Sequence, residues 1–376
     1  MKAKFELLTT GTRDLRFDSL RGLFLVCMTV NHLPTEIRLV TDQSLGIFSA
    51  AEGFVFMSGL IAGWVYTRKL RKLGNQGLLT SSLQRADSIY RWQIGSFVAA
   101  LVCVQVIAMA IGYCSPAVPK LFFEHPMEAL GLGLTLLYQP GLLDLLPMYC
   151  GFVLLLPAAL RALEAGRTWA VIVPSALVWL AMQFAPDVSG APLYPVNTGS
   201  FNMLSWQFLF IIGVTIGHAR VSGRQQVDRP SPWIVAACTA IVVYGIGLRD
   251  ANWRPLWQDS VYGALLNKPA LGLFRMADFG SLAYLVACFG RMFPRALTWK
   301  PLAFLGQHSL SVVAAQSVLL IAILPFPALF ATAFARTSTA VVVVAFLFVV
   351  AVVHRRVVAA GQAPGSPVPV GTERAA

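Results

Sequence analysis

The sequence predicts an all-α integral membrane protein, a polytopic helix bundle with about 10 transmembrane helices and both termini cytoplasmic. Of its 376 residues, 57% are hydrophobic and only 12% are charged, and the mean hydropathy is +0.68. Soluble globular chains carry about 25% charged residues, and one water-soluble core of this length cannot hide so much apolar surface. The net charge is +12. The basic residues lie between the apolar runs, so membrane topology explains them better than nucleic-acid binding does.

Apolar runs of about 20 residues are long enough to cross a bilayer. The segment 126–139 is apolar but short, so we expect it to lie at the interface or to re-enter the membrane. The expected spans lie near residues 15–35, 46–67, 90–112, 142–160, 168–185, 203–219, 232–248, 270–290, 302–324 and 331–353.

Lysine and arginine gather in alternate loops and thereby predict the orientation. The intervening segments 186–202 and 325–330 contain neither residue. Ten spans put all the cation-rich loops on one side, which is the cytoplasm by the positive-inside rule. The first of these loops, after the second span, carries Arg68, Lys69, Arg71, Lys72 and Arg85.

The chain is expected to form one transmembrane domain, residues 15–356. Residues 1–14 precede it as a cytoplasmic segment, and residues 357–376 follow as a Pro/Gly-rich tail that we expect to be disordered. The six cysteines form no C-x-x-C pair and are interpreted as small core residues. No spacing typical of a metal site is present, and no cleavable signal peptide is convincing, so the first span is expected to remain as an anchor.

The first span carries the ionisable residues Asp18, Arg21 and His32. Ionisable groups in a span are costly and are functional candidates. Arg21 and His32 are eleven residues apart, so at about 100° per residue they project from one helix face. They lie about 16 Å apart along the axis. A purely structural interpretation, an Asp18–Arg21 ion pair with an interfacial histidine, stays open.

The second span carries Glu52 near its outer end, as the first span carries His32. A carboxylate beside an imidazole fixes its tautomer and raises its basicity, which a general base needs. Glu52 as a merely buried, hydrogen-bonded group is the alternative. Gly59 and Gly63 form a G-x-x-x-G pattern that favours close helix packing.

Further polar residues lie in or beside the later spans and suggest a polar interior, although each alone is usually a link between helices. They are Gln93, Asp144, Gln207, Arg275, Asp278 and His308. The external loop near 249–269 contains Trp253 and Trp257, a combination suited to sugar contact. An interfacial aromatic belt explains these tryptophans equally well.

Arg21 and His32 form an R-x10-H pattern that resembles the signature of transmembrane acyltransferases of the acyltransferase-3 type. Longer stretches are more specific: RFDSLRGLFLVCMTVNHLP, SAAEGFVFMSGLIAGWVYTRKL and FNMLSWQFLFIIGVTIG resemble the OpgC family. The resemblance extends over about residues 13–325. Gln93 is a departure, since many members of the family carry a histidine early in the third span.

This resemblance implies a bacterial inner-membrane enzyme that moves an acyl group, in the founding activity succinyl, to a periplasmic glucan. It implies acyl-CoA in the cytoplasm as the donor and a glucan hydroxyl as the acceptor. Besides the lipid bilayer, these two are the expected partners. We expect neither a metal cofactor nor a nucleic-acid partner.

O-acyl transfer from a thioester needs a base for the acceptor hydroxyl and stabilisation of the tetrahedral intermediate. We expect His32 to be the base and Glu52 to orient it. Arg21, oriented by Asp18, is expected to hold the carboxylate or thioester end of the donor. CoA phosphates are expected at the cytoplasmic cations, although topology alone also explains these residues: Arg68, Lys69, Arg71, Lys72, Arg85 and Arg91.

Residues expected to contact substrate are Asp144, Gln207, Trp253, Trp257, Arg275, Asp278 and His308. Two other functions fit the same polar interior. One is a transporter or flippase for a glycan or lipid-linked precursor, which the absence of a clear internal repeat disfavours. The other is a non-catalytic scaffold that retains the fold.

Overall fold

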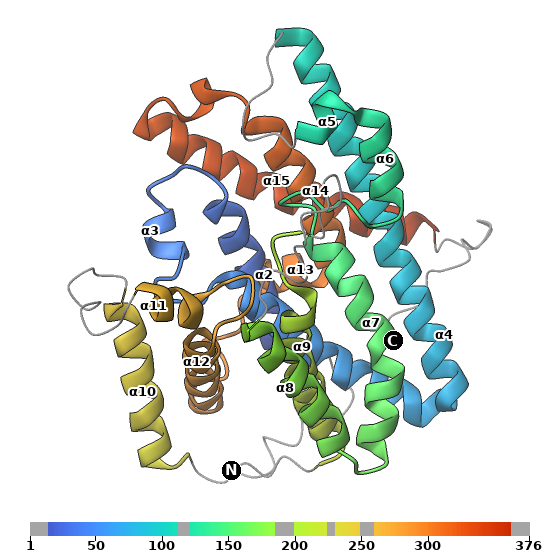
Figure 1. The fold of residues 1–376 in the computed structure, drawn as a ribbon, viewed down its shortest axis with the longest axis vertical. Coiled ribbons are helices and arrows are strands. Elements are labelled where there is room, and N and C mark those ends of the chain that lie inside the picture. The colour runs from blue at the N-terminus through green and yellow to red at the C-terminus, as the bar shows by residue number, and fades with distance from the viewer. Residues whose placement is uncertain (1–13, 112–119, 185–198, 224–229, 249–258, 362–376) are drawn as a thin grey trace.

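The structure is a computed structural model that describes residues 14–111, 120–184, 199–223, 230–248 and 259–361. Within these ranges the chain forms helices joined by loops, with no β-strand (Figure 1), which confirms the all-α prediction. The helices are α2 (Leu15–Asn31), α3 (Arg38–Thr41), α4 (Ala50–Ile111), α5 (Lys120–Glu124), α6 (Pro126–Leu134), α7 (Leu145–Glu164), α8 (Trp169–Phe184), α9 (Met203–Val221), α10 (Pro232–Gly247), α11 (Asp259–Leu266), α12 (Leu273–Met292), α13 (Lys300–Gln307), α14 (Ser309–Ile323), η3 (Pro327–Phe330) and α15 (Ala333–Gly361).

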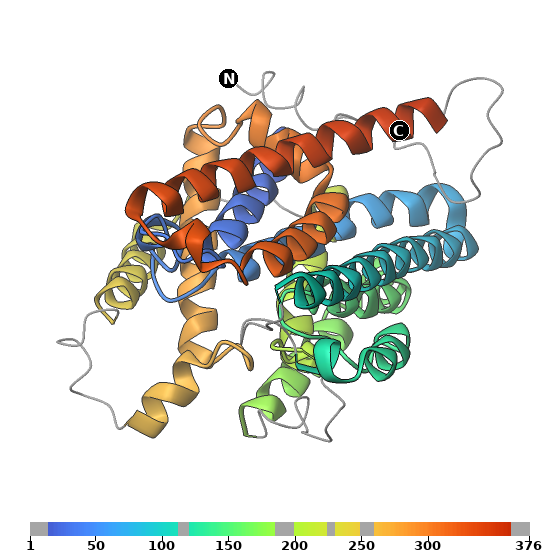
Figure 2. The ribbon, with the colours of Figure 1, turned by 90° about the horizontal axis from the view of Figure 1, so that it is seen from above.

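Helix α4 has 62 residues and is broken into two arms at Gly74, whose φ is 71°. Glycine adopts this left-handed conformation without steric cost, and the chain turns back there (Figures 1 and 2). The predicted second and third spans lie on the two arms. The segment between them, expected to be a loop, is helical on both sides of Gly74 because it is rich in good helix formers such as Leu, Gln and Arg.

Five described helices are long and apolar enough to cross a membrane: α4, α7, α9, α12 and α15. The pair α13 and α14, bent by 84°, adds a sixth if it forms one span. Helices α8 and α10 are apolar but have only 16 residues each. These lengths establish a multi-pass helical protein but not the predicted number of about ten spans. Helix α6 has nine residues, too few to cross the bilayer.

Helices α4 and α9 pack against each other through two facing pairs of glycines. A Cβ added to Gly59 or Gly63 would lie 2.2 Å from a carbonyl oxygen of α9. A Cβ added to Gly213 or Gly217 would lie 2.4 Å or 2.1 Å from a carbonyl oxygen of α4. The predicted G-x-x-x-G packing is therefore confirmed, and a second G-x-x-x-G on the partner helix completes it.

The start of α2 is tied to the end of α9. The Asp14 carboxylate accepts hydrogen bonds from Arg16 Nε at 2.9 Å and Nη2 at 2.7 Å, and it lies 3.6 Å from Arg220 Nη2. Burial works to raise the pKa of Asp14, but the hydrogen bonds and charge of Arg16 and the charge of Arg220 hold that pKa below its usual value. The ionised carboxylate thus anchors the N-terminal end of α2 to the bundle.

Candidate functional site

Helix α13 crosses α2 at backbone contact distance. A Cβ added to Gly22 would lie 1.9 Å from the carbonyl oxygen of Leu302, and one added to Gly306 would lie 1.9 Å from that of Asp18. No larger side chain fits at either glycine, so the two backbones touch. This crossing fixes the junction between α13 and α14 against the charged part of α2.

At that junction the chain bends by 84° at His308, and Ser309 begins α14. The buried Arg21 guanidinium donates a hydrogen bond to Ser309 Oγ. It also lies over the ring of Phe54, 5.7 Å from the centroid. A broken helix at membrane depth is tolerated where it is enclosed by protein or lines a cavity, and this one does line a cavity.

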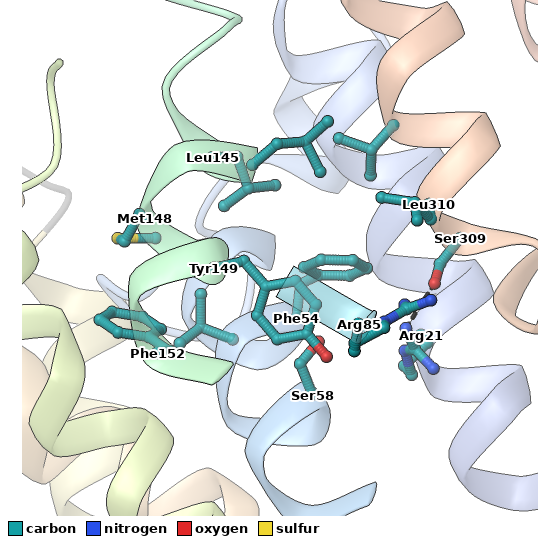
Figure 3. A pocket seen from close by; sticks show the side chains of 13 residues that line it. Arg21, Phe54, Ser58, Arg85, Leu145, Met148, Tyr149, Phe152, Ser309 and Leu310 are labelled. Atoms are coloured by element: carbon teal, nitrogen blue, oxygen red, sulfur yellow. Dashed lines mark hydrogen bonds between the residues drawn. The ribbon is translucent and has the colours of Figure 1, made fainter. Parts of the chain in front are cut away.

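The cavity lies beside Arg21, between α2, α4, α7 and α14 (Figure 3). About 20 Å³ of it is accessible to the centre of a water-sized sphere, which is room for about one water molecule. Most of the wall is apolar and aromatic, and its polar groups come from α2, α4 and α14. The lining residues are Arg21, Phe54, Val55, Ser58, Arg85, Leu145, Leu146, Met148, Tyr149, Phe152, Ser309, Leu310 and Val313.

Two polar groups of this cavity have no protein partner. Within the described ranges no hydrogen bond or ion pair holds the guanidinium of the half-buried Arg85. The Ser58 hydroxyl is buried and likewise lacks a hydrogen-bond partner there. Unsatisfied buried polar groups are rare in native proteins and point to a missing water, ion or ligand.

His32 directly follows the last residue of α2, and its side chain is exposed. The charged groups that act on its imidazole are Lys268, Arg38 and Asp42. At a rise of about 1.5 Å per residue, His32 lies about 16 Å along the helix from Arg21. The two residues of the R-x10-H pattern therefore occupy different environments, one enclosed beside the cavity and one open at the helix end.

Glu52 has a different partner from the one we predicted. Its fully buried carboxylate forms an ion pair with Arg275, 223 residues later in the chain, and accepts hydrogen bonds from the backbone and hydroxyl of Ser49. No hydrogen bond joins it to His32 among the described residues. In this structure Glu52 is therefore bound to Arg275 instead of His32, since a buried carboxylate is stabilised far more by a guanidinium than by an exposed imidazole.

Arg275 and Asp278 lie one turn apart on α12 and both bind the start of α4. Asp278 accepts a hydrogen bond from the backbone N–H of Ile47 at 2.7 Å. A Cβ on Gly46 would lie 2.2 Å from an Asp278 carboxylate oxygen, so the backbone approaches this carboxylate closely. The structure thus brings Glu52, Arg275 and Asp278 together at the segment that leads into α4.

The remaining predicted site residues are dispersed. Asp144 accepts a hydrogen bond from the N–H of Ser200 at 2.8 Å. The Gln207 side chain accepts a hydrogen bond from the Ser175 hydroxyl and donates one to the Ser175 carbonyl, which links α8 to α9. The His308 ring lies 4.8 Å from the Phe304 ring and 5.3 Å from that of His354.

Two predictions concern residues that the structure does not describe, and the position of Gln93 is described. Trp253 and Trp257 lie outside the described residues, as does the tail beyond residue 361. Gln93, at the predicted start of the third span, donates to the Leu143 carbonyl at 2.9 Å. Within the described ranges, no three His, Cys, Asp or Glu side chains converge as metal ligands.

Four of the six cations expected to bind CoA phosphates are held by protein groups. Lys72 and Arg85 have no such contact among the described residues. The other four contact an aromatic ring, a hydroxyl or a carboxylate: Arg68 with Trp64 at 4.8 Å, Lys69 with Ser81 at 3.3 Å, Arg71 with Glu164 at 2.8 Å, and Arg91 with Asp87 at 2.6 Å. These contacts account for the four cations without a ligand.

A family model described as OpgC protein matches residues 13–358. The chain belongs to the OpgC family. The match extends past the predicted resemblance and takes in most of α15. Comparisons with curated proteins and with solved structures give no significant match. Membership of the OpgC family, together with the apolar helices, indicates a multi-pass membrane acyltransferase that acts on glucans.

Proposed function

We propose that this protein is an inner-membrane O-acyltransferase that moves an acyl group, such as succinyl, from cytoplasmic acyl-CoA to a hydroxyl of a periplasmic glucan. The observation that carries this proposal is the placement of two unlike groups on α2. Arg21 is enclosed beside a cavity with unpartnered polar groups, and His32 is exposed about 16 Å along the same helix. This separation suits a donor and an acceptor that approach from opposite sides.

In the proposed reaction, His32 removes the proton from the acceptor hydroxyl as its oxygen attacks the thioester carbonyl carbon. The tetrahedral oxyanion then collapses, the carbon–sulfur bond breaks, and the new ester forms. CoA leaves as a thiolate that takes up the proton held by His32. Arg21 anchors the donor and does not itself take part in proton transfer.

The topology that goes with this proposal has ten spans with both termini cytoplasmic. In this topology each arm of α4 is one span, each of the short apolar helices α8 and α10 is one span, and the bent pair α13–α14 together forms one span. The cation-rich loops then all face the cytoplasm. With this orientation Arg21 lies nearer the cytoplasm and His32 nearer the periplasm.

Mass spectrometry of periplasmic glucans tests the proposal. Glucans from cells that express the protein should carry acyl esters that are absent from cells lacking it. Purified protein should also transfer labelled acyl groups from acyl-CoA to the isolated glucan. Unmodified glucans in both cell types, together with no transfer in vitro, would contradict the assignment.

A further inference from the structure

The Arg21–Arg85 cavity presents two guanidinium groups to a space that holds about one water molecule. We propose that Arg21 and Arg85 bind a phosphate group of the donor, from which the pantetheine arm extends to His32. This inference rests on the proposed function. It assigns a ligand-binding role to Arg85, Ser58 and Ser309 inside the bundle, separate from the exposed cations of the cytoplasmic cluster.

An anion fits this cavity on electrostatic grounds. Two like charges that face one small, mostly apolar space repel each other, and low local polarity strengthens that repulsion. None of the described residues that line the cavity carries a carboxylate. An anion between the guanidiniums would turn repulsion into two attractive, charge-assisted contacts. The hydroxyls of Ser58, on α4, and Ser309, on α14, also line the cavity and can donate to its oxygens (Figure 3).

The length of the donor decides between a phosphate and an acyl-chain carboxylate. The pantetheine arm has about 12 bonds between the phosphate oxygen and sulfur, and an extended chain advances about 1.25 Å per bond, giving about 15 Å. That matches the axial distance of about 16 Å between Arg21 and His32. A succinyl carboxylate lies only about 4 Å from its thioester carbon. Held in this cavity, it would keep the thioester far from His32.

Arg85 is suited to admit the ligand. The free cavity is too small for a phosphate, so a wall must move. The Arg85 side chain is half-buried and has no hydrogen bond or ion pair to break within the described ranges. Arg21, in contrast, is already held by Ser309. We therefore expect Arg21 to be the fixed part of the site and Arg85 the part that closes on the phosphate.

Three donors with the same acyl group test the inference: the thioesters of CoA, 4′-phosphopantetheine and pantetheine. Wild-type protein should use the two phosphorylated donors about 10- to 100-fold better in kcat/KM, as expected for charge-assisted hydrogen bonds. Arg85→Met should reduce that preference about tenfold. Its kcat/KM with the pantetheine thioester should stay near the wild-type value, because that donor offers no phosphate to bind.

Arg91→Met is the matched control. The sequence grouped Arg91 with the expected phosphate-binding cations, but in the structure it lies outside the cavity lining, is exposed, and pairs with Asp87 at 2.6 Å on the same arm of α4. It should keep the full preference for phosphorylated donors. Equal losses with all three donors in Arg85→Met, or an unchanged preference, would overturn the inference. So would a wild type that does not distinguish phosphopantetheine from pantetheine, the result expected if a lipid phosphate fills the cavity.

Two further measurements test the inference if Arg85→Met does not fold or if the protein transfers no acyl group. If Arg85→Met does not fold, Ser58→Ala, which removes only an unpartnered hydroxyl, should narrow the same preference by a few fold. If wild-type protein transfers no acyl group, the proposed function fails, and isothermal titration with CoA alone still tests the site. Arg85→Met should then bind CoA about tenfold more weakly than Arg91→Met, and equal affinities would reject the site.

Discussion

Glu52 and Arg275 form an ion pair whose side chains are 0% and 3% exposed. The pair joins the start of α4 to α12, and Asp278, one turn further along α12, binds the backbone just before α4. These contacts hold the segment that connects α2 to α4. Because a buried charge without its partner is far costlier than a buried pair, this relationship allows a direct test of the role of Glu52.

Glu52→Gln should destabilise the protein strongly, by about 3–5 kcal/mol, since it leaves the Arg275 charge uncompensated. Glu52→Gln combined with Arg275→Gln should cost less than the sum of the two single changes. Thermal unfolding of purified protein in detergent measures both. A stable Glu52→Gln protein with an altered pH profile of transfer would instead restore the predicted role of Glu52 beside His32.

The glycines between α4 and α9 make a second prediction. Gly213→Ala introduces a Cβ 2.4 Å from the Phe56 carbonyl oxygen, so the helices must separate, at a cost of about 1–3 kcal/mol. Gly95→Ala on the facing helix α4 is the control, because nothing lies within 4 Å of its Cβ position. Thermal stability should fall for the first and not for the second. Equal melting temperatures would mean that this interface relaxes easily.

Reporter fusions test the topology. Fusions after residues 75, 195, 225 and 328 should report cytoplasm, periplasm, cytoplasm and periplasm in that order, because alternate loops differ in their lysine and arginine content. Alkaline phosphatase and a fluorescent protein give complementary signals on the two sides. A cytoplasmic signal at 195 or 328 is incompatible with ten spans and two cytoplasmic termini.

Local sequence patterns predicted most of the helices but few of the contacts between residues on different helices. The apolar runs predicted the helices, and Gly59–Gly63 predicted close packing, yet nothing local identified Gly213 and Gly217 as the facing glycines. Glu52 and Arg275 are 223 residues apart, a separation that no helical period can relate. The sequence therefore identified the intramembrane charges as candidates, while their partners depended on how the helices pack.

The position of Arg85 beside the cavity was also not predicted from the sequence. Its sequence neighbourhood, between two spans and close to other cations, predicted an exposed loop residue. The chain instead bends at Gly74 and continues as helix. Arg85, on this second arm of α4, therefore lies at the cavity beside Arg21. A run of good helix formers after a glycine was the signal that could have predicted this, because it favours a helical hairpin over a loop.

His32→Ala makes the sharpest prediction about the chemistry. General base catalysis typically contributes about 10²- to 10⁴-fold, so the variant should lose transfer by that order. Membrane insertion and thermal stability should stay near wild type, since the His32 side chain is exposed and packs in no buried cluster. His125→Ala, a change at another exposed histidine, is the matched control and should transfer normally. Initial rates with labelled acyl-CoA and isolated glucan provide the measurement.

If His32→Ala transferred at close to the wild-type rate, the imidazole would not be the base. Arg21 and its cavity would then remain a donor site, and the group that deprotonates the acceptor would have to be sought among the charged residues around His32, with Lys268 and Asp42 the first to replace.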